Sequence, residues 1–413
     1  MGCIPTKTLV RSAKAIHTAR RGAEFGFRTS KIEADWPRIR ARKNEVVGAI
    51  VGGLMRGIEQ HPGLTLVHGW AEFLDVHRLA VNGGVVESER IILASGVRPR
   101  VPKLDGLDAV DCLTNETVMD MDTLPASLVI IGGGPEGVEF GQIFRRFGVA
   151  VVILQRRDRL LPREDPEIST EVAELLQEEG VTIHTNAVPT RVERTASGLT
   201  VVATVDGQAR RFDTERILVA AGRRPHELGR LRLDAAGIEG DVEHGVSVDE
   251  TLRTTAPNVW AIGDVIGRMQ HQHFSVYTGR LAARNALTNA HLTYDTFRIP
   301  RAVFTDPEVA SIGWTAEEAE ARGHRVKVGK HPVRAISRAR AMGEGRGFVK
   351  VVTDAATDRL LGMHLLAPMG ADLLPQAVLM MQTGSAAPLR DVVYIHPTLS
   401  EGVKAAASKA RPS

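Results

Sequence analysis

The sequence predicts an α/β protein built around a parallel β-sheet, and a strand–helix–strand pattern near its middle carries the prediction. Leu128–Ile131 and Val149–Leu154 are unbroken apolar runs, which are typical of strands buried on both faces of a parallel sheet. Between them lies a glycine-rich turn and a segment with helical spacing of its large apolar side chains, Phe140, Ile143, Phe144 and Phe147. Two strands joined by a helix form the unit from which parallel sheets are built.

The turn after the first strand has the pattern G-x-G-x-x-G, formed by Gly132, Gly134 and Gly137. The three glycines serve, in order, a tight turn, close approach of the backbone to a pyrophosphate, and tight packing of helix on strand. Pro135 suits a first helical turn, and the helix N-terminus offers free amides to a diphosphate. A purely structural turn is the alternative, but the flanking strands favour a dinucleotide site.

The residues after the second strand indicate which dinucleotide is bound. NAD sites usually place Asp or Glu there to hold the ribose hydroxyls, whereas this chain has Gln155, Arg156 and Arg157. Two cations and no carboxylate favour a 2′-phosphate and hence NADPH over NADH. The alternative is a solvated basic loop.

Composition excludes several classes of function. The 413 residues allow two or three domains, and 43% hydrophobic and 24% charged residues are ordinary for a globular protein. A net charge of +3 indicates neither nucleic acid nor an acidic membrane surface as a partner. No apolar run matches a membrane span or a signal peptide, and two cysteines, Cys3 and Cys112, are too few for a disulfide framework. We therefore expect a cytoplasmic protein.

The N-terminal segment places a cysteine at a predicted helix start. Pro5 suits a first turn, and Leu9, Ala13 and Ile16 continue with helical spacing, so Cys3 is expected just ahead of the helix. The helix dipole and Lys7 would both favour a reactive thiolate. A buried structural cysteine is the alternative, and placement alone leaves both open.

The stretch GCIPTKTL, residues 2–9, resembles the second half of the redox-active segment of the FAD-dependent pyridine nucleotide-disulfide oxidoreductases, which include dihydrolipoamide dehydrogenase, glutathione reductase and mercuric reductase. The resemblance implies that Cys3 is the flavin-facing cysteine. Its partner would precede Met1, as would the first dinucleotide unit, which holds the ADP part of FAD. We therefore expect a misplaced start site or a truncation.

The rest of the chain follows the same family in order. A helix is expected over 35–60, short strands over 64–74 and 78–81 with residues 82–84 as their turn, and a further strand over 90–94. Residues 94–99 and 219–225 resemble the family's A-T-G-x-x-P turns and bracket the nucleotide unit. The predicted domains are the remainder of an FAD-binding domain at 1–120, an NAD(P)-binding domain at 121–245, a return segment of the FAD-binding domain at 246–295 and an α+β dimerisation domain at 296–413.

Further cofactor contacts come from the resemblance. Glu139 would meet Lys7 near the flavin, although an isolated glutamate on a helix usually faces solvent; its apolar neighbours favour burial. Asp264, in a strand-terminal G-D, would bind the ribityl chain, with capping of a helix at about 275–287 as the alternative. The resemblance also places Ala71, Val188, Gly222 and Gln272 at the cofactors. His271 and His273 do not indicate a metal site, because no further ligand lies nearby in the sequence.

The last third resembles the family's dimerisation domain, beginning at Phe304–Gly313. Thr315 and Glu318 have capping-box spacing, a hairpin is expected over 348–353 and 360–366, and an apolar helix over 370–383.

The final motif contains His396 and Glu401. A lone histidine is more often a surface or core group, but the family uses this pair as an acid–base couple that reaches the partner subunit's flavin. The glutamate fixes the histidine tautomer and raises its basicity. The resemblance therefore implies a homodimer.

Taken together, the resemblance implies an enzyme with FAD and NADP or NAD that acts on a disulfide or dithiol substrate. The chain ends without the vicinal cysteines of mercuric reductases and keeps the motif histidine, which favours a disulfide over mercury. The alternative is a truncated, non-catalytic homologue that dimerises and binds NAD(P)H without turnover.

Overall fold

The structure, a computed structural model, describes residues 2–196, 198–225 and 228–412. The expectation of a misplaced start site or a truncation concerns Met1, which lies outside the described residues. The chain forms two compact units. The first comprises Met1–Asn44, Val101–Ala221 and Phe297–Ser413, and the second comprises Glu45–Arg100 and Gly222–Thr296.

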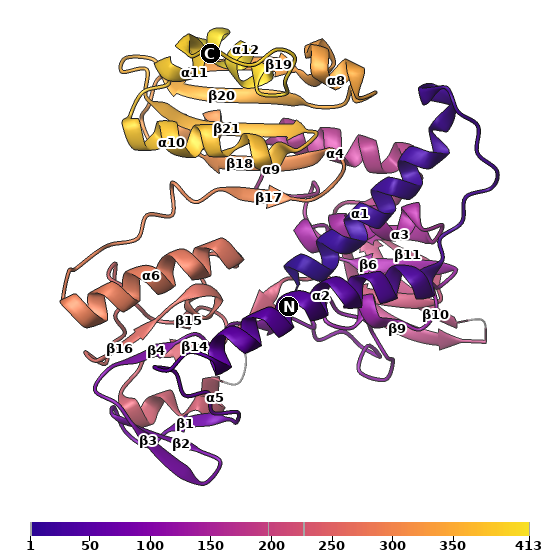
Figure 1. Ribbon diagram of the computed structural model, residues 1–413. Helices are drawn as coiled ribbons and strands as arrows, with labels where there is room; N and C mark the ends of the chain where they lie inside the picture. The colour runs from indigo at the N-terminus through magenta and orange to yellow at the C-terminus, as the bar shows by residue number, and fades with distance from the viewer. Residues whose placement is uncertain (1, 197, 226–227, 413) are drawn as a thin grey trace. The chain divides into compact units, whose positions relative to one another are not determined.

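The predicted strand–helix–strand unit is confirmed in the first unit (Figure 1). Four parallel strands form a sheet in the order β12-β6-β7-β8, and helix α3 connects β6 to β7. An antiparallel sheet, β11-β10-β9, follows β8 along the chain. The elements are β6 (Ser127–Ile131), α3 (Pro135–Arg146), β7 (Ala150–Leu154), α4 (Pro166–Glu178), β8 (Thr182–His184), β9 (Ala187–Thr195), β10 (Gly198–Val205), β11 (Gln208–Thr214) and β12 (Arg216–Val219), with a 3₁₀ turn η2 (Val118–Asp120) before β6.

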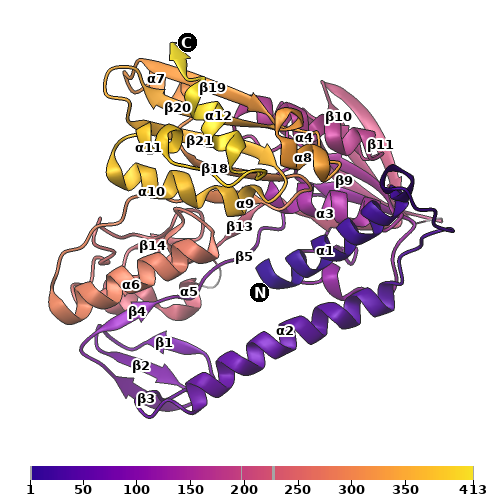
Figure 2. The ribbon, with the colours of Figure 1, turned by 45° about the horizontal axis from the view of Figure 1, so that its top comes forward.

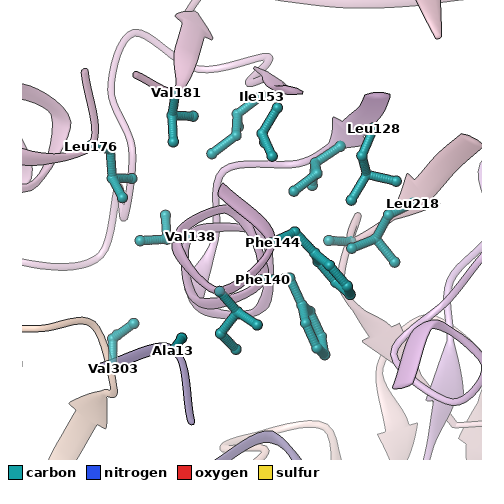
Figure 3. Close-up of a cluster of buried hydrophobic side chains, with 14 of the residues drawn as sticks. Ala13, Leu128, Val138, Phe140, Phe144, Ile153, Leu176, Val181, Leu218 and Val303 are labelled. Atoms are coloured by element: carbon teal, nitrogen blue, oxygen red, sulfur yellow. The ribbon is translucent and has the colours of Figure 1, made fainter. Parts of the chain in front are cut away.

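The core of this region surrounds α3. Phe140 and Phe144 are fully buried, together with Val138 on the same helix and Leu128 and Ile153 from the sheet (Figure 3). Each such side chain contributes about 1.5–3 kcal/mol relative to its exposed state. The apolar stripe of α3 is therefore what fixes the glycine turn at its N-terminus against the sheet.

Two long helices precede the nucleotide sheet. Helix α1 (Cys3–Arg20) is followed by a 3₁₀ turn, η1 (Gly22–Phe25), and runs beside α3, with Leu9 and Ala13 in the same core (Figure 1). Cys3 was expected just ahead of α1 but is the first residue of the helix. The helix can begin before Pro5, because amides in the first turn have no helical acceptor and the missing amide of proline costs nothing there. Helix α2 (Trp36–Glu59) confirms the predicted helix and continues from the first unit into the second.

The C-terminal part of the first unit is an antiparallel sheet of six strands in the order β17-β18-β21-β20-β19-β22. Helix α10 packs on β21, and α12 packs on β19 and β20 (Figure 2). The elements are β17 (Arg301–Val303), β18 (Glu308–Gly313), α7 (Ala316–Glu320), β19 (Val326–Pro332), η5 (Val333–Ala335), α8 (Ser337–Ala341), β20 (Phe348–Asp354), β21 (Leu360–Ala367), α9 (Gly370–Leu373), α10 (Pro375–Thr383), α11 (Ala387–Asp391), α12 (Glu401–Ser408) and β22 (Arg411–Pro412).

The capping box at Thr315 and Glu318 and the predicted hairpin are confirmed by α7, β20 and β21. The prediction of one helix over 370–383 is wrong. The segment forms α9 and α10 with a break at Leu374, because Pro375 has no amide hydrogen and disfavours a helical residue before it.

The second unit contains a three-stranded antiparallel sheet, β1-β2-β3, and a parallel pair, β16-β4, on which α6 packs (Figure 2). The predicted strand over 64–74 is wrong for most of its length, since only Ala71–Phe73 pairs. Residues 82 and 83 connect β2 to a third strand, which begins at Gly84 and which the sequence did not predict. The elements are β1 (Ala71–Phe73), β2 (Arg78–Val81), β3 (Gly84–Glu87), β4 (Ile91–Leu93), β5 (Arg98–Pro99), β13 (Arg223–Arg224), α5 (Leu228–Leu231), η3 (Leu233–Ala236), β14 (Gly240–Asp241), β15 (Gly245–Val246), β16 (Val259–Ala261), η4 (Gly263–Ile266) and α6 (Gln272–Thr288).

Across the described residues, no helix is both long enough and apolar enough to cross a lipid bilayer.

Candidate active site

The glycine turn between β6 and α3 is shaped for a ligand that approaches the backbone. Gly132 has a φ of +117°, and a Cβ there would lie 2.3 Å from the Ala220 carbonyl oxygen. A Cβ on Gly137 would lie 1.9 Å from the Gly132 carbonyl oxygen. Gly134, the N-cap residue of α3, has nothing within 4 Å of the corresponding point. The turn is therefore closed on its inner side and open at the helix N-terminus, which fits a dinucleotide pyrophosphate.

The residues after β7 separate into one inward and two outward side chains. Gln155 is buried; its Nε2 donates to the Arg159 carbonyl oxygen at 2.9 Å, and its Oε1 lies 3.4 Å from the Gly133 amide nitrogen. It thus supports the glycine turn from beneath. Arg156 and Arg157 are exposed. Val188, at the start of β9, is 50% exposed, and the neighbouring Ala187 amide donates to the Gln155 carbonyl oxygen.

An ion pair connects the Cys3 helix to the helix that begins at the glycine turn. Lys7 Nζ lies 3.0 and 2.8 Å from the two carboxylate oxygens of Glu139, which is only 5% exposed. The Phe304 amide donates to Glu139 Oε1 at 2.7 Å, and the Phe304 ring centroid lies 4.5 Å from Lys7 Nζ. Glu139 is therefore buried with a cation, as the sequence favoured, and does not lie on a solvated face.

The two cysteines lie in different surroundings. Cys3 is exposed on the first turn of α1, one turn before Lys7 on the same helix face. The structural alternative of a buried Cys3 is thus wrong. Cys112 is half-buried against the core between the nucleotide sheet and β9–β11, and burial raises the pKa of its thiol. Of the two thiols, that of Cys3 is the more exposed.

A buried charge network holds α1 and α3 to the segment after β17. Asp306 accepts from Lys14 Nζ at 2.6 Å and from Arg146 Nη1 at 2.8 Å, and Arg146 also pairs with Glu179 at 2.7 Å. Burial alone would raise the pKa of Asp306, but Arg146 and Lys14 outweigh it and hold that pKa below its usual value. The network fixes α1, and with it the placement of Lys7.

Asp264 lies in the second unit, directly after β16, in the short helix η4. The alternative of an N-cap for α6 is wrong, since His271 occupies that position. Burial raises the pKa of the Asp264 carboxyl, opposed by Arg223, whose Nη1 lies 3.5 Å away, and by a hydrogen bond from Ser275. A half-buried carboxylate with these weak partners fits a ligand hydroxyl as a further donor.

Three other predicted cofactor residues also lie in the second unit. Ala71 begins β1, Gly222 has a φ of +96°, and Gln272 is an exposed first residue of α6. The rings of His271 and His273 stack with centroids 5.2 Å apart. Over the described ranges, no three His, Cys, Asp or Glu side chains are grouped so that they could hold a metal ion.

His396 and Glu401 form a pair at the start of α12. His396 Nδ1 lies 2.9 Å from Glu401 Oε1, and the Thr398 amide donates to Glu401 Oε2 at 2.9 Å. The hydrogen bond from His396 holds the pKa of the Glu401 carboxyl below its usual range. Since the carboxylate can only accept, Nδ1 donates and Nε2 of the 69% exposed imidazole faces outward.

The structure thus brings together Lys7 with Glu139 and His396 with Glu401, and it places Arg156, Arg157 and Val188 beside the end of β7. Sequence reasoning missed Phe304 and Arg223. Phe304 stands in a motif that was recognised, but nothing in the motif predicts that its ring covers Lys7. The position of Arg223, directly after Gly222, gave no indication of the Asp264 contact.

Comparisons with known proteins show which family the chain resembles. Residues 1–279 match the pyridine nucleotide-disulphide oxidoreductase family, and residues 299–407 match its dimerisation domain. Dihydrolipoyl dehydrogenase from Bacillus subtilis is 34% identical over 98% of this chain and 88% of that protein. Mercuric reductase from Bacillus cereus is 32% identical over 98% of this chain and 64% of that protein.

Solved structures show the same likeness. The HOCl-induced flavoprotein disulfide reductase RclA from Escherichia coli superposes with a TM-score of 0.87 at 32% identity, covering 99% of this chain and 90% of that one. LpdA from Mycobacterium tuberculosis superposes with a TM-score of 0.89 at 27% identity, covering 98% of this chain and 89% of that one. Members of this family use FAD and NAD(P)H and act on sulfur groups. The chain belongs to the pyridine nucleotide-disulphide oxidoreductase family, as its sequence motifs predicted.

Proposed function

We propose that this chain is an NADPH-dependent flavoprotein that reduces a small disulfide substrate and acts as a homodimer. The observation that carries the proposal is the ion pair between Lys7 and Glu139. It ties the helix that begins at the exposed Cys3 thiol to the helix that begins at the dinucleotide turn. A sulfur atom and a nucleotide site are thereby held on two packed helices of one unit.

The nucleotide would lie over the glycine turn. Gly132, Gly134 and Gly137 leave the helix N-terminus open to the pyrophosphate, and Gln155 holds the turn from below. Arg156 and Arg157 would bind the 2′-phosphate through charge-assisted hydrogen bonds, with the exposed Val188 offering an apolar contact. Neither guanidinium has an ion pair in the part of the chain that the structure describes, so both are available for a phosphate.

FAD, when bound, supplies the two-electron transfer that connects the nicotinamide to sulfur. In the second unit, Asp264 would accept a hydrogen bond from a hydroxyl of FAD, and Ala71, Gly222 and Gln272 are the other cofactor contacts predicted there. In the first unit, Lys7 is the predicted flavin contact. Cys3, exposed on the first turn of α1, would be the sulfur nucleophile or leaving group. Glu139 would keep the Lys7 ammonium in place.

His396 would carry the protons. Its outward Nε2 can deliver a proton to a departing thiolate and recover one from a thiol, while Glu401 holds the tautomer through Nδ1. Reduction of one disulfide by NADPH consumes one proton and yields two thiols. His396 lies beside exposed Val393 and Ile395, 97% and 79% accessible, which is a surface suited to a subunit interface.

A steady-state assay tests the proposal. The purified chain, supplied with FAD, is given NADPH or NADH with lipoamide, glutathione disulfide or Hg²⁺. We expect disulfide-dependent oxidation with a higher kcat/KM for NADPH than for NADH. NADPH binding without turnover of any acceptor would instead support the non-catalytic dimer.

A further inference from the structure

We propose that Phe304 is a positioning residue that holds the Lys7–Glu139 pair from two sides at once. The effect of Phe304 on catalysis rests on the proposed function, whereas its contacts with Lys7 and Glu139 do not depend on that function. The Phe304 backbone amide donates to Glu139 Oε1 at 2.7 Å, and its ring covers Lys7 Nζ at 4.5 Å. One residue therefore contacts the anion through its backbone and the cation through its side chain.

The backbone contact is rigidly supported. Residues 303–306 lie along one stripe of α3, where Glu139, Gln142 and Arg146 follow one another at helical spacing. Val303 shares the core around α3. The Asp306 amide donates to Gln142 Oε1 at 2.8 Å, and Gln142 Nε2 donates to the Asp306 carbonyl oxygen at 3.1 Å. The Phe304 amide is thus fixed between two anchored neighbours.

The ring contact limits where the ammonium can go. Lys7 donates to both carboxylate oxygens of the buried Glu139 and keeps a side-chain exposure of 30%. An aromatic face attracts an ammonium and replaces water on one side of it. Without the ring, the flexible lysine stem could leave the carboxylate for solvent, while the backbone amide would still hold Glu139.

The first test measures Lys7 directly and needs no flavin. The free chain is pulse-labelled with acetic anhydride, and acetylation of individual lysines is followed by peptide mass spectrometry. In Phe304→Leu, which keeps an apolar side chain and the backbone amide, we expect Lys7 to react roughly three- to tenfold faster than in the wild type, on the scale of one cation–π contact. Phe304→Tyr, which keeps the aromatic face, should restore the wild-type rate.

Lys330 is the internal reference, because its Nζ lies over a different ring, that of Phe348, at 4.0 Å. Its labelling should be the same in all three proteins. Equal Lys7 rates in Phe304→Leu and the wild type would overturn the proposal. A parallel rise at Lys330 would also overturn it, since that result reports general loosening of the fold.

The second test uses the flavin-loaded protein. If Lys7 acts at the flavin, Phe304→Leu should shift the visible flavin spectrum and lower kcat with little change in the KM for NADPH, and Phe304→Tyr should reverse both. Faster Lys7 labelling with an unchanged flavin spectrum would support the positioning role of Phe304 and count against the proposed place of Lys7 at the cofactor. The failure of one proposal is therefore distinguishable from the failure of the other.

Discussion

At the residue scale, two side-chain pairs of the first unit, Lys7 with Glu139 and His396 with Glu401, differ in burial. The Lys7–Glu139 pair has its carboxylate in the core, whereas the His396–Glu401 pair lies at the surface with its imidazole 69% exposed. A buried carboxylate cannot lose its cation without a large desolvation cost, so the first pair is structural as well as chemical. An exposed imidazole with a fixed tautomer is free to exchange protons.

His396→Ala should slow disulfide turnover by roughly 10²–10⁴-fold, because general acid–base catalysis contributes about that much. Glu401 would remain anchored by the Thr398 amide, so the variant should fold normally. Stopped-flow measurement of thiol–disulfide exchange checks this effect. Exchange at the wild-type rate would remove His396 from the mechanism.

Arg156→Ala/Arg157→Ala tests the coenzyme. The loss of charge-assisted hydrogen bonds to the 2′-phosphate should reduce kcat/KM for NADPH roughly 10- to 100-fold, with little change for NADH. Arg28→Ala, at an exposed arginine outside the nucleotide sheet, is the control and should affect neither coenzyme. An equal fall for both coenzymes would contradict a 2′-phosphate site.

At the scale of elements, the contact between α3 and its glycine turn can be tested by one methyl group. In Gly137→Ala, the added Cβ would lie 1.9 Å from the Gly132 carbonyl oxygen, so α3 must move from its strand. We expect a loss of stability of about 1–3 kcal/mol, typical of overpacking, together with weaker NADPH binding.

Gly48→Ala in helix α2 is the matched control, since its added Cβ has open space. It should be neutral or stabilise by up to about 1 kcal/mol, as alanine does in a helix. Thermal unfolding and NADPH titration of both variants measure the effects. Normal stability and affinity in Gly137→Ala would disprove the tight helix–strand approach.

The network at Asp306 predicts a pH dependence. The folded pKa of this carboxyl lies below its unfolded value of about 3.9, so its stabilisation is complete above that value and is lost as the pH falls through the folded pKa. Asp306→Asn should cost roughly 3–5 kcal/mol at pH 7, as for a broken buried ion pair. The difference from the wild type should shrink below about pH 4.

Asp122→Asn is the control, because Asp122 pairs with Arg40 at the surface and its side chain is 95% exposed. It should change stability by less than about 1 kcal/mol. Urea unfolding between pH 3 and 7 measures both variants. A constant difference between Asp306→Asn and the wild type across this range would contradict the ion-pair account.

The sequence predicted elements well where local rules decide the structure. Unbroken apolar runs predicted β6 and β7, the capping-box spacing predicted α7, and helical spacing predicted α1. The prediction of a strand over residues 64–70 was wrong. Their apolar composition fits a strand, but strand pairing depends on a neighbouring strand that the local sequence does not specify. Phe304 over Lys7 could not be predicted either, since the two residues are far apart in the sequence and meet only through the packing of α1, α3 and β17.

At the scale of the whole molecule, family membership fixes the class of chemistry and leaves substrate and coenzyme as proposals. The described residues include an open glycine turn, an exposed Cys3 thiol and an exposed His396 paired with Glu401 in one unit, and a half-buried carboxylate at Asp264 in the other. We propose that each of them binds a cofactor or transfers a proton or electrons in a reductase reaction.

The visible absorption spectrum of the purified chain, supplied with FAD and titrated anaerobically with NADPH, tests this most directly. We expect a bound flavin whose absorption band is bleached by NADPH and returns when a disulfide is added. A protein that retains no flavin, or a flavin band that NADPH leaves unchanged, would contradict it.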